Sequence, residues 1–192
     1  MKLSHAFTLK LACLSLLVVV IALAVVGASA PVAHAATITV SNANDSGTGS
    51  LRQTIADAAA GDTITFAGDY TIPLTSELTI SQNLTIDGES HSVTVSGEYV
   101  TRVFYVNSGV TFHLNNLTVT KGRVTSAYGG GLFNSNGTVN VTNSAFSDNS
   151  ATGGGGLCNF KAGTLNVTNS TFSGNSATSY GGQQLPLGLF QA

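Results

Sequence analysis

The only charge-rich interval of this 192-residue chain could support chemistry on carbohydrates. Its ionisable residues, within IDGESHSVTVSGEYVTR, are Asp87, Glu89, His91, Glu98 and Arg102. Glycoside hydrolases need two carboxylates at a fixed separation across the scissile bond, and polysaccharide lyases need a basic residue near a Ca²⁺ site. The interval therefore gives one hypothesis, a polysaccharide lyase or glycoside hydrolase that uses residues 87–102.

The same residues also fit solvated turns, which is the interpretation that we favour. Asp-Gly at 87–88 and Gly-Glu at 97–98 are typical of turns. In addition, no acidic residue recurs at a fixed position of the repeat described below, since Asp148 aligns with Gly174. A fold alone does not establish a function, so we expect no catalytic residues and no catalysis.

A second group of oxygen-bearing side chains lies in the segment SNANDSGTG. Asn42, Asn44 and Asp45 could ligate Ca²⁺ through their oxygens. However, the loop lacks the terminal Glu of an EF-hand, and its composition is equally typical of a turn. We favour the turn and expect neither a metal nor another cofactor.

These residues must be positioned by a repeat that occupies the second half of the chain. The segment GGGLFNSNGTVNVTNSAFSDNSA, residues 129–151, returns as GGGLCNFKAGTLNVTNSTFSGNSA, residues 154–177. A period of about 26 residues with glycines at one end indicates stacked structural units. Such a protein usually acts through the surface that its stack creates.

The repeat extends backward along the chain in a weaker form. Aligning Asn116 with Asn143 and Asn169 gives two nearly equal spacings. The same alignment predicts stacked apolar columns: Phe112, Val139 and Leu165; Leu114, Val141 and Val167; Val119, Phe146 and Phe172. An earlier unit, NLTIDG at 83–88, fits this frame at a longer spacing, with Asn83 aligned with Asn116.

The fold predicted from this pattern is all-β. Short runs of alternating apolar residues, separated by Gly, Asn, Ser and Asp, are typical of strands joined by tight turns. With no helix available for a crossover, the strands can run parallel only by coiling. We therefore predict a right-handed, single-stranded parallel β-helix, with roughly six rungs about 4.8 Å apart and a length of about 30 Å.

Asparagine and glycine are expected to form the corners of the coils. We predict that Asn116, Asn143 and Asn169 form a structural ladder, because stacked amides can hydrogen-bond and Asn tolerates a left-handed backbone. For the same reason the N-x-S/T triplets at Asn83, Asn116 and Asn166 indicate ladders and turns rather than glycosylation sites. Gly129–131 and 153–156 are expected to supply positive φ angles.

Threonines spaced two apart give a third functional hypothesis. Thr63 and Thr65, like Thr118 and Thr120, would lie on one face of a strand. A flat threonine array could bind ice or a crystal surface. Because the pairs do not recur in every rung, we rank this below adhesion and below carbohydrate chemistry.

The start of the coil is predicted to carry a cap. Ser50-Leu-Arg-Gln53 has capping-box spacing, and Gly61 ends an amphipathic run, so we expect a helix over about 51–60. With strands at 37–40 and 63–66 it would form an N-terminal cap over residues 36–66 that shields the first rung. Rungs would then occupy residues 67–180, followed by an irregular tail, residues 181–192.

The first 35 residues are predicted to be a secretory signal. Lys2 and Lys10 precede an apolar run, and Ala33-His34-Ala35 fits a cleavage site. A transmembrane anchor is the alternative, because the apolar run nearly spans a bilayer. We expect a secreted or cell-surface protein that meets the membrane only if the signal stays uncleaved.

Charge and cysteine content narrow the range of partners. Without the signal, nine acidic and five basic residues leave a formal net charge of −4. Nucleic acid is therefore not expected as a partner, since it requires a basic surface. Cys158 would remain as the only cysteine; it aligns with Phe133 and is expected to pack as a small apolar residue.

Two parts of the chain resemble known families. The segment TITVSNANDSGTGSLRQTIADAAAGDTITF, residues 37–66, resembles the N-terminal region of exported bacterial proteins with a CSLREA-type domain. The GGGL and FSDN or FSGN elements resemble the GGA(I/L) and FxxN repeats of chlamydial polymorphic outer membrane proteins. These resemblances imply a pectin-lyase-like solenoid that is structural or adhesin-like, with no catalytic residues to transfer. The implied partner is a carbohydrate or another cell-surface ligand.

The C-terminal residues leave the repeat. After Gly182 the chain reads QQLPLGLFQA, whose apolar residues could fold over the last rung as a cap. The alternative is a truncated or frame-shifted end. An open rung would then offer an unpaired strand edge, and the protein would self-associate there.

Overall fold

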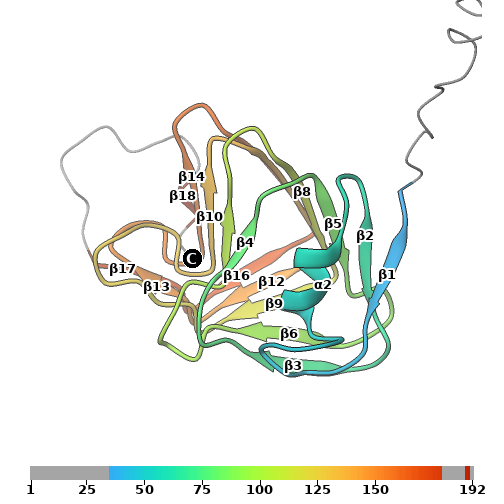
Figure 1. The fold of residues 1–192 in the computed structure, drawn as a ribbon. Helices are drawn as coiled ribbons and strands as arrows, with labels where there is room; N and C mark the ends of the chain where they lie inside the picture. The colour runs from blue at the N-terminus through green and yellow to red at the C-terminus, as the bar shows by residue number, and fades with distance from the viewer. Residues whose placement is uncertain (1–34, 179–188, 191–192) are drawn as a thin grey trace, which may run out of the picture. The chain divides into compact units, whose positions relative to one another are not determined.

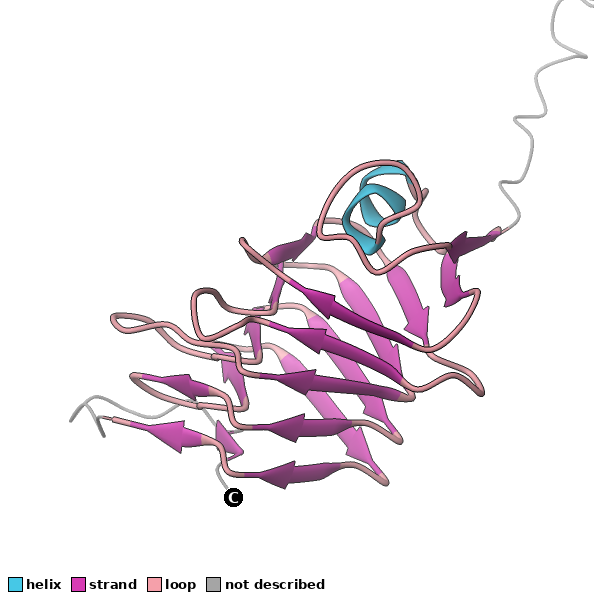
Figure 2. Cartoon of the chain, turned by 90° about the horizontal axis from the view of Figure 1, so that it is seen from below, coloured by secondary structure: helices cyan, strands magenta, loops and turns pink. Residues whose placement is uncertain are grey.

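Short strands with alternating apolar residues coil around one axis and stack from turn to turn (Figure 1; Figure 2). This computed structural model describes residues 35–178 and 189–190, all within the unit Ala35–Ala192. The strands pair in parallel except for the C-terminal strand Leu189–Phe190, and the helical content of the described residues is one short helix. The predicted all-β, right-handed parallel β-helix is confirmed.

The strands of the coils lie in three main sheets, which we name A, B and C. Sheet A contains β1 (Thr37–Val40), β2 (Thr63–Phe66), β5 (Leu84–Asp87), β8 (Thr111–Asn115), β11 (Thr138–Thr142) and β15 (Thr164–Thr168). Sheet B contains β3 (Tyr70–Pro73), β6 (Val93–Ser96), β9 (Leu117–Thr120), β12 (Ala145–Ser147) and β16 (Thr171–Ser173). Sheet C contains β4 (Leu78–Ile80), β7 (Phe104–Val106), β10 (Leu132–Ser135), β14 (Leu157–Phe160) and β18 (Leu189–Phe190). A further pair consists of β13 (Ser150–Ala151) and β17 (Ser176–Ala177).

The predicted register is confirmed over the last three coils. Phe112 pairs with Val139 and Val139 with Leu165, as the alignment of the three asparagines requires. Phe146 pairs with Val119 on one side and with Phe172 on the other. The apolar columns of the sequence are therefore the columns of the core.

The predicted register of the segment 83–88 is wrong. Leu84 pairs with Phe112 and Ile86 with Leu114, so the spacing to the next coil is shorter than the predicted one. The sequence NLTI at 83–86 looks like NLTV at 116–119, but β5 belongs to sheet A whereas β9 belongs to sheet B. A shift by an odd number of residues would turn every inward side chain outward, so burial selects the observed register.

The core fills the space between the three sheets. Phe104, Phe112 and Phe146 are among its largest fully buried side chains. Phe146 also stacks on Phe172, with ring centroids 5.1 Å apart. In the last coil Leu165 is only partly buried, whereas Val139 at the equivalent position one coil earlier is fully buried.

A helix closes the N-terminal end of the stack (Figure 2). Helix α2 covers Leu51–Asp57, and Ser50 caps it by accepting a hydrogen bond from the Gln53 amide. Leu51 and Ile55 are buried in the core, as expected for a cap.

The helix is shorter than the predicted 51–60. Ala58 already has an extended backbone. The Asp62 carboxylate accepts hydrogen bonds from the amides of Ala59 and Ala36, at 2.7 and 2.8 Å, and thereby holds the following residues in a turn. The solenoid makes about five turns instead of six, because α2 takes the place of sheet B and C strands between β1 and β2.

Two predicted segments lie mostly outside the described residues. The signal segment, residues 1–35, is described only at Ala35, and the tail, residues 181–192, only at β18. There Leu189 pairs with Cys158 and Phe190 with Leu157, so β18 runs antiparallel to β14. The expectations of a signal, a terminal cap, a truncation and self-association stay predictions. Within the described residues, no helix has the length and hydrophobicity needed to cross a membrane.

Candidate functional site

The three corners of the coils differ in length and composition. At the A–B corner, between sheets A and B, the last three coils turn at residue 116, at 143–144 and at 169–170. At the B–C corner, between sheets B and C, the coils turn through 74–77, 97–103, 121–131 and 148–156. The longer B–C loops carry most of the ionic and exposed aromatic groups described below.

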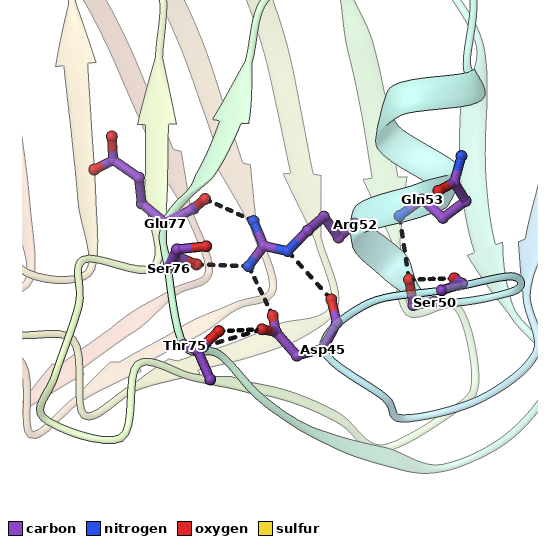
Figure 3. Close-up of polar contacts among 8 residues, drawn as sticks. Asp45, Ser50, Arg52, Gln53, Thr75, Ser76 and Glu77 are labelled. Carbon is purple, nitrogen blue, oxygen red and sulfur yellow. Dashed lines mark hydrogen bonds and ion pairs between the residues drawn. The ribbon is translucent and has the colours of Figure 1, made fainter.

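The arginine of the GSLR segment joins the cap to the first B–C turn (Figure 3). Arg52 Nη1 donates to the Glu77 carbonyl at 2.9 Å, and Nη2 donates to the Ser76 carbonyl at 2.6 Å. Nη2 also pairs with Asp45 Oδ1 at 2.7 Å. The amide and hydroxyl of Thr75 donate to Asp45 Oδ2. The segment that resembles the CSLREA-type domain therefore anchors the capping loop and helix to the first coil.

Two of the three candidate Ca²⁺ ligands, Asn42 and Asp45, have side chains engaged in hydrogen bonds. The Asn42 side-chain oxygen accepts from the Asn44 amide at 3.1 Å, as in an Asx-turn. Burial alone would raise the pKa of Asp45, but hydrogen bonds from Thr75 and Arg52, with the charge of Arg52, hold it below its usual value. Within the part of the chain that the structure describes, no group of three His, Cys, Asp or Glu residues could hold a metal ion.

The ionic anchor continues into the next coil through Arg102. Its Nη1 donates to Glu77 Oε2 at 2.7 Å, and the rest of the guanidinium donates to the carbonyls of Gly129 and Tyr128, each at 2.9 Å. Arg102 is 8% exposed and lies over the rings of Tyr105 and Phe133. These contacts hold neighbouring B–C loops together. They also engage the guanidinium of Arg102, which is one of the candidate catalytic groups.

The other ionisable residues of the interval lie at two corners. Asp87 and Glu89 are at the A–B corner, where Asp87 accepts from the side-chain amides of Asn115 and Asn116 and from the Glu89 backbone. Glu98 is at the B–C corner and accepts from Ser96 Oγ at 2.5 Å. The four-residue strand β6 separates the two groups by about 13 Å. The structure does not bring Asp87 and Glu89 next to Glu98 and Arg102.

His91 lies beside the first of these groups, on the A–B turn. Its Nδ1 is 3.5 Å from Asp69 Oδ1, and that same oxygen accepts from the Ser92 amide. The contact joins the A–B turns of two successive coils.

The three asparagines predicted as a ladder occupy equivalent positions at the A–B corner. Asn116, Asn143 and Asn169 have φ angles of +59°, +50° and +48°, so each supplies the left-handed turn. The Asn116 amide, however, donates to Asp87 Oδ1 at 2.7 Å rather than to the next asparagine.

Direct amide ladders occur at other asparagines. Asn134 donates to Asn159 at 2.7 Å, and Asn149 donates to Asn175 at 2.9 Å. All four side chains are buried, and they also satisfy backbone groups of the neighbouring turns, such as the Gly122 amide. The sequence signal was present, since these positions repeat in LFN and LCN and in FSDN and FSGN.

The glycines of the GGG segments serve two purposes, of which the sequence suggested one. Gly129 and Gly154 have positive φ angles, as expected. The prediction is wrong for the other glycines of these segments, Gly130, Gly131, Gly153, Gly155 and Gly156, which do not have positive φ angles. Gly130 is required by close packing instead. A Cβ there would lie 2.4 Å from the Ser150 carbonyl oxygen and 2.7 Å from that of Gly155. The backbones of two successive coils meet too closely at this corner for a side chain.

The threonine pairs do not form one array. Thr63 and Thr65 lie in sheet A, and Thr118 and Thr120 lie in sheet B. The hypothesis of a flat ice-binding surface made by these pairs therefore loses its geometric basis.

Cys158 pairs with Phe133 in the register and is fully buried. Burial raises the pKa of its thiol to about 11, although the charge of Arg102 opposes the shift. Little thiolate is present near neutral pH, which fits the predicted packing role.

The B–C corner also presents exposed apolar groups around a hollow. Tyr99, Val100 and Tyr128 are 49%, 68% and 43% exposed. Beside the first two is a hollow of about 500 Å³, whose lining includes Glu77, Arg102 and Arg123. The turn that displays Tyr99 has two successive non-glycine residues in the left-handed region, Glu98 at +49° and Tyr99 at +58°. Such backbone is uncommon and is enriched at functional sites.

The sequence of this chain matches no family model, and it matches no curated protein.

Proposed function

We propose that this protein is a secreted or cell-surface binding protein, adhesin-like in its action, which presents its B–C loops to a carbohydrate or another cell-surface ligand. One observation carries the proposal. The large apolar side chains exposed in residues 35–178 all lie on the B–C loops, and two of them border the 500 Å³ hollow. Exposed apolar groups gathered beside a hollow are typical of interaction sites.

The loops are held in place by the stack. The Tyr99 amide donates to the Lys121 carbonyl at 2.7 Å, and the Arg123 amide donates to the Thr101 carbonyl at 2.8 Å. Each loop is thus hydrogen-bonded to a loop of a neighbouring coil. Little conformational entropy remains to be lost when a ligand binds, which favours affinity.

The chemistry of the hollow fits recognition of a surface ligand. Tyr99 offers an apolar ring with a polar end, and Tyr and Arg are enriched at binding hot spots. Arg123 is exposed and, within the described residues, takes part in no ion pair. The charge of Glu77 is balanced by Arg102, so Arg123 is available to a ligand.

A binding assay tests the proposal. Beads coated with the purified protein would be scored for attachment to cells and to a glycan array, using the wild type and a Tyr99→Ser/Val100→Ser double variant. We expect the double variant to lose most attachment. Ala162→Ser, which changes an exposed apolar residue at another corner, is the matched control and should bind normally. Equal attachment by all three proteins would refute the proposed site.

The alternative of a polysaccharide lyase or hydrolase calls for its own measurement. Pectate and alginate would be incubated with the protein, with and without Ca²⁺. Turnover that disappears in Asp87→Asn, a change that keeps the shape of the side chain, would replace the binding proposal with an enzymatic one.

A further inference from the structure

A second groove lies at the A–B corner, away from the B–C loops. Its volume is about 360 Å³, and successive coils contribute the same positions to its lining. Asn116, Asn143 and Asn169, at equivalent positions of three coils, belong to this lining. Val93, Leu117 and Ala145 also belong to the lining, and of these three Ala145 is the one that is not fully buried. Because equivalent residues of stacked coils line it, the groove runs along the axis of the solenoid.

We propose that this groove binds an extended, neutral, β-linked polysaccharide, with successive sugars placed on successive coils. The coils repeat at about 4.8 Å, the spacing of hydrogen-bonded strands. Each sugar of an extended β-linked chain advances the polymer by a similar length. One asparagine could therefore meet each sugar in turn, and a sugar has both the polar edge and the apolar face that this lining would contact.

Two of the three asparagine side chains at this groove are available for a ligand, because the Asn116 amide donates to Asp87. Among the described residues, the side chains of Asn143 and Asn169 have no hydrogen-bond partner, and both are exposed. An amide has two donors and an acceptor, so it can bind a sugar hydroxyl in either sense. All three asparagines share a left-handed backbone, which gives their side chains the same starting direction.

The charges around the groove favour a neutral polymer. Its lining contains no Asp, Glu, Lys or Arg. Two acidic groups contact its lining: Asp87 is hydrogen-bonded to Asn116, and Asp69 lies 3.5 Å from His91. A polymer that carries carboxylates would meet these acids and be repelled.

The test is calorimetric titration of the purified protein with dimers, tetramers and hexamers of the cello, xylo and chito series. Each added sugar gains contacts without a new loss of rigid-body freedom, so in at least one series the hexamer should bind on the order of ten-fold tighter than the dimer. Oligogalacturonate of matched length should bind more weakly. The proposal fails if no series binds, if affinity does not rise with length, or if the acidic polymer binds better.

Two matched variants locate the binding. Asn143→Gly removes one side-chain amide of the groove but keeps the left-handed backbone. It should weaken binding of the hexamer about five-fold, because one hydrogen bond to the ligand is lost. Asn136→Gly makes the same change at a residue outside the groove, with φ of +73°, and should bind normally. Equal effects of the two would overturn the proposal.

The same titration separates this inference from the proposed function. Tyr99→Ser/Val100→Ser should bind the hexamer as well as the wild type does. If that double variant no longer binds the hexamer while Asn143→Gly still binds it, the sugar site lies at the B–C corner, and the proposal of a site in the A–B groove is refuted.

Discussion

The A–B and B–C corners join the same coils in opposite ways. At the A–B corner, Asn116, Asn143 and Asn169 share one conformation and repeat at nearly constant spacing. The B–C loops differ in length from coil to coil and contain the contacts of Arg52 and Arg102. A solenoid can thus keep one corner uniform, which fixes its register, while another corner varies and supplies individual anchors and exposed groups.

This comparison predicts that substitutions at the B–C corner destabilise the protein more than substitutions at the A–B corner. The largest effect is expected for Gly130→Ala. Its Cβ would lie within 3 Å of three backbone oxygens, those of Ser150, Gly155 and Gly122. Because backbone cannot move aside as a side chain can, the free energy of unfolding should fall by at least about 3 kcal/mol.

Chemical denaturation would measure this loss. Gly68→Ala is the control, since the nearest atom to its added Cβ is 4.0 Å away. It should change the stability by less than about 0.5 kcal/mol. Similar losses for the two variants would show that close packing at the B–C corner is not decisive.

The next largest effect is expected for Arg102→Met. Methionine keeps an apolar stem over Tyr105 and Phe133 but leaves Glu77 and two backbone carbonyls without their donor. Stability should fall by about 3 kcal/mol, at the low end for a buried pair because Glu77 is partly exposed. Arg123→Met, at an exposed arginine of the same corner, should be nearly neutral in the same denaturation experiment. If the two substitutions lower the free energy of unfolding equally, Arg102 is not the anchor that its contacts indicate.

A pH-dependent effect is expected from Asp45. Its pKa is lowered in the folded state, so its contacts add stability above the unfolded pKa of about 3.8, and this is lost as pH falls through the folded pKa. Asp45→Ala should cost about 2 kcal/mol at pH 7 and progressively less below pH 4. Thermal unfolding of wild type and variant across this range gives the difference. A constant difference from pH 7 to pH 2 would contradict the role of the carboxylate charge.

The smallest effect is expected at the A–B corner. Asn143→Gly keeps the left-handed backbone and should change the stability by only a few tenths of a kcal/mol. Asn143→Ala places a Cβ in that conformation and should cost about 1 kcal/mol. Denaturation midpoints of the two variants measure the difference. A loss as large as that of Gly130→Ala would remove the contrast between the corners.

How well the sequence predicts each region depends on the same contrast between uniform and variable coil lengths. Phe112, Val139 and Leu165 could be aligned from the sequence because the coils that contain them are nearly equal in length. The predicted alignment of Asn83 with Asn116 is wrong because it follows the similar sequences NLTI and NLTV. The residues of β5 that face the core require the alignment of Leu84 with Phe112 instead. The ladders of Asn134 and Asn149 had a clear repeat signal, but whether an asparagine faces the core or a corner depends on its strand.

The candidate site was only partly accessible from the sequence. The sequence names Glu98 and Arg102 as candidate catalytic residues, but it does not indicate the exposed side chains of Tyr99 and Val100 beside them. Single aromatic residues between turn residues give no periodic signal. Their exposure depends on how the loops 97–103 and 121–131 stack, which is a tertiary property.

The coil itself follows from the order of the amino acids, because a period of about 26 residues with alternating apolar positions can bury its core only by stacking parallel strands. Which polar residues meet, in contrast, depends on the folded arrangement. Arg52 reaches Ser76, and Glu77 reaches Arg102, across intervals of 24 and 25 residues that belong to coils of unequal length. Because loop length varies at the B–C corner, the separation of two residues along the chain does not predict whether they form a contact. The stacking of buried side chains sets the position of each loop, and that position determines which polar residues are close enough to interact.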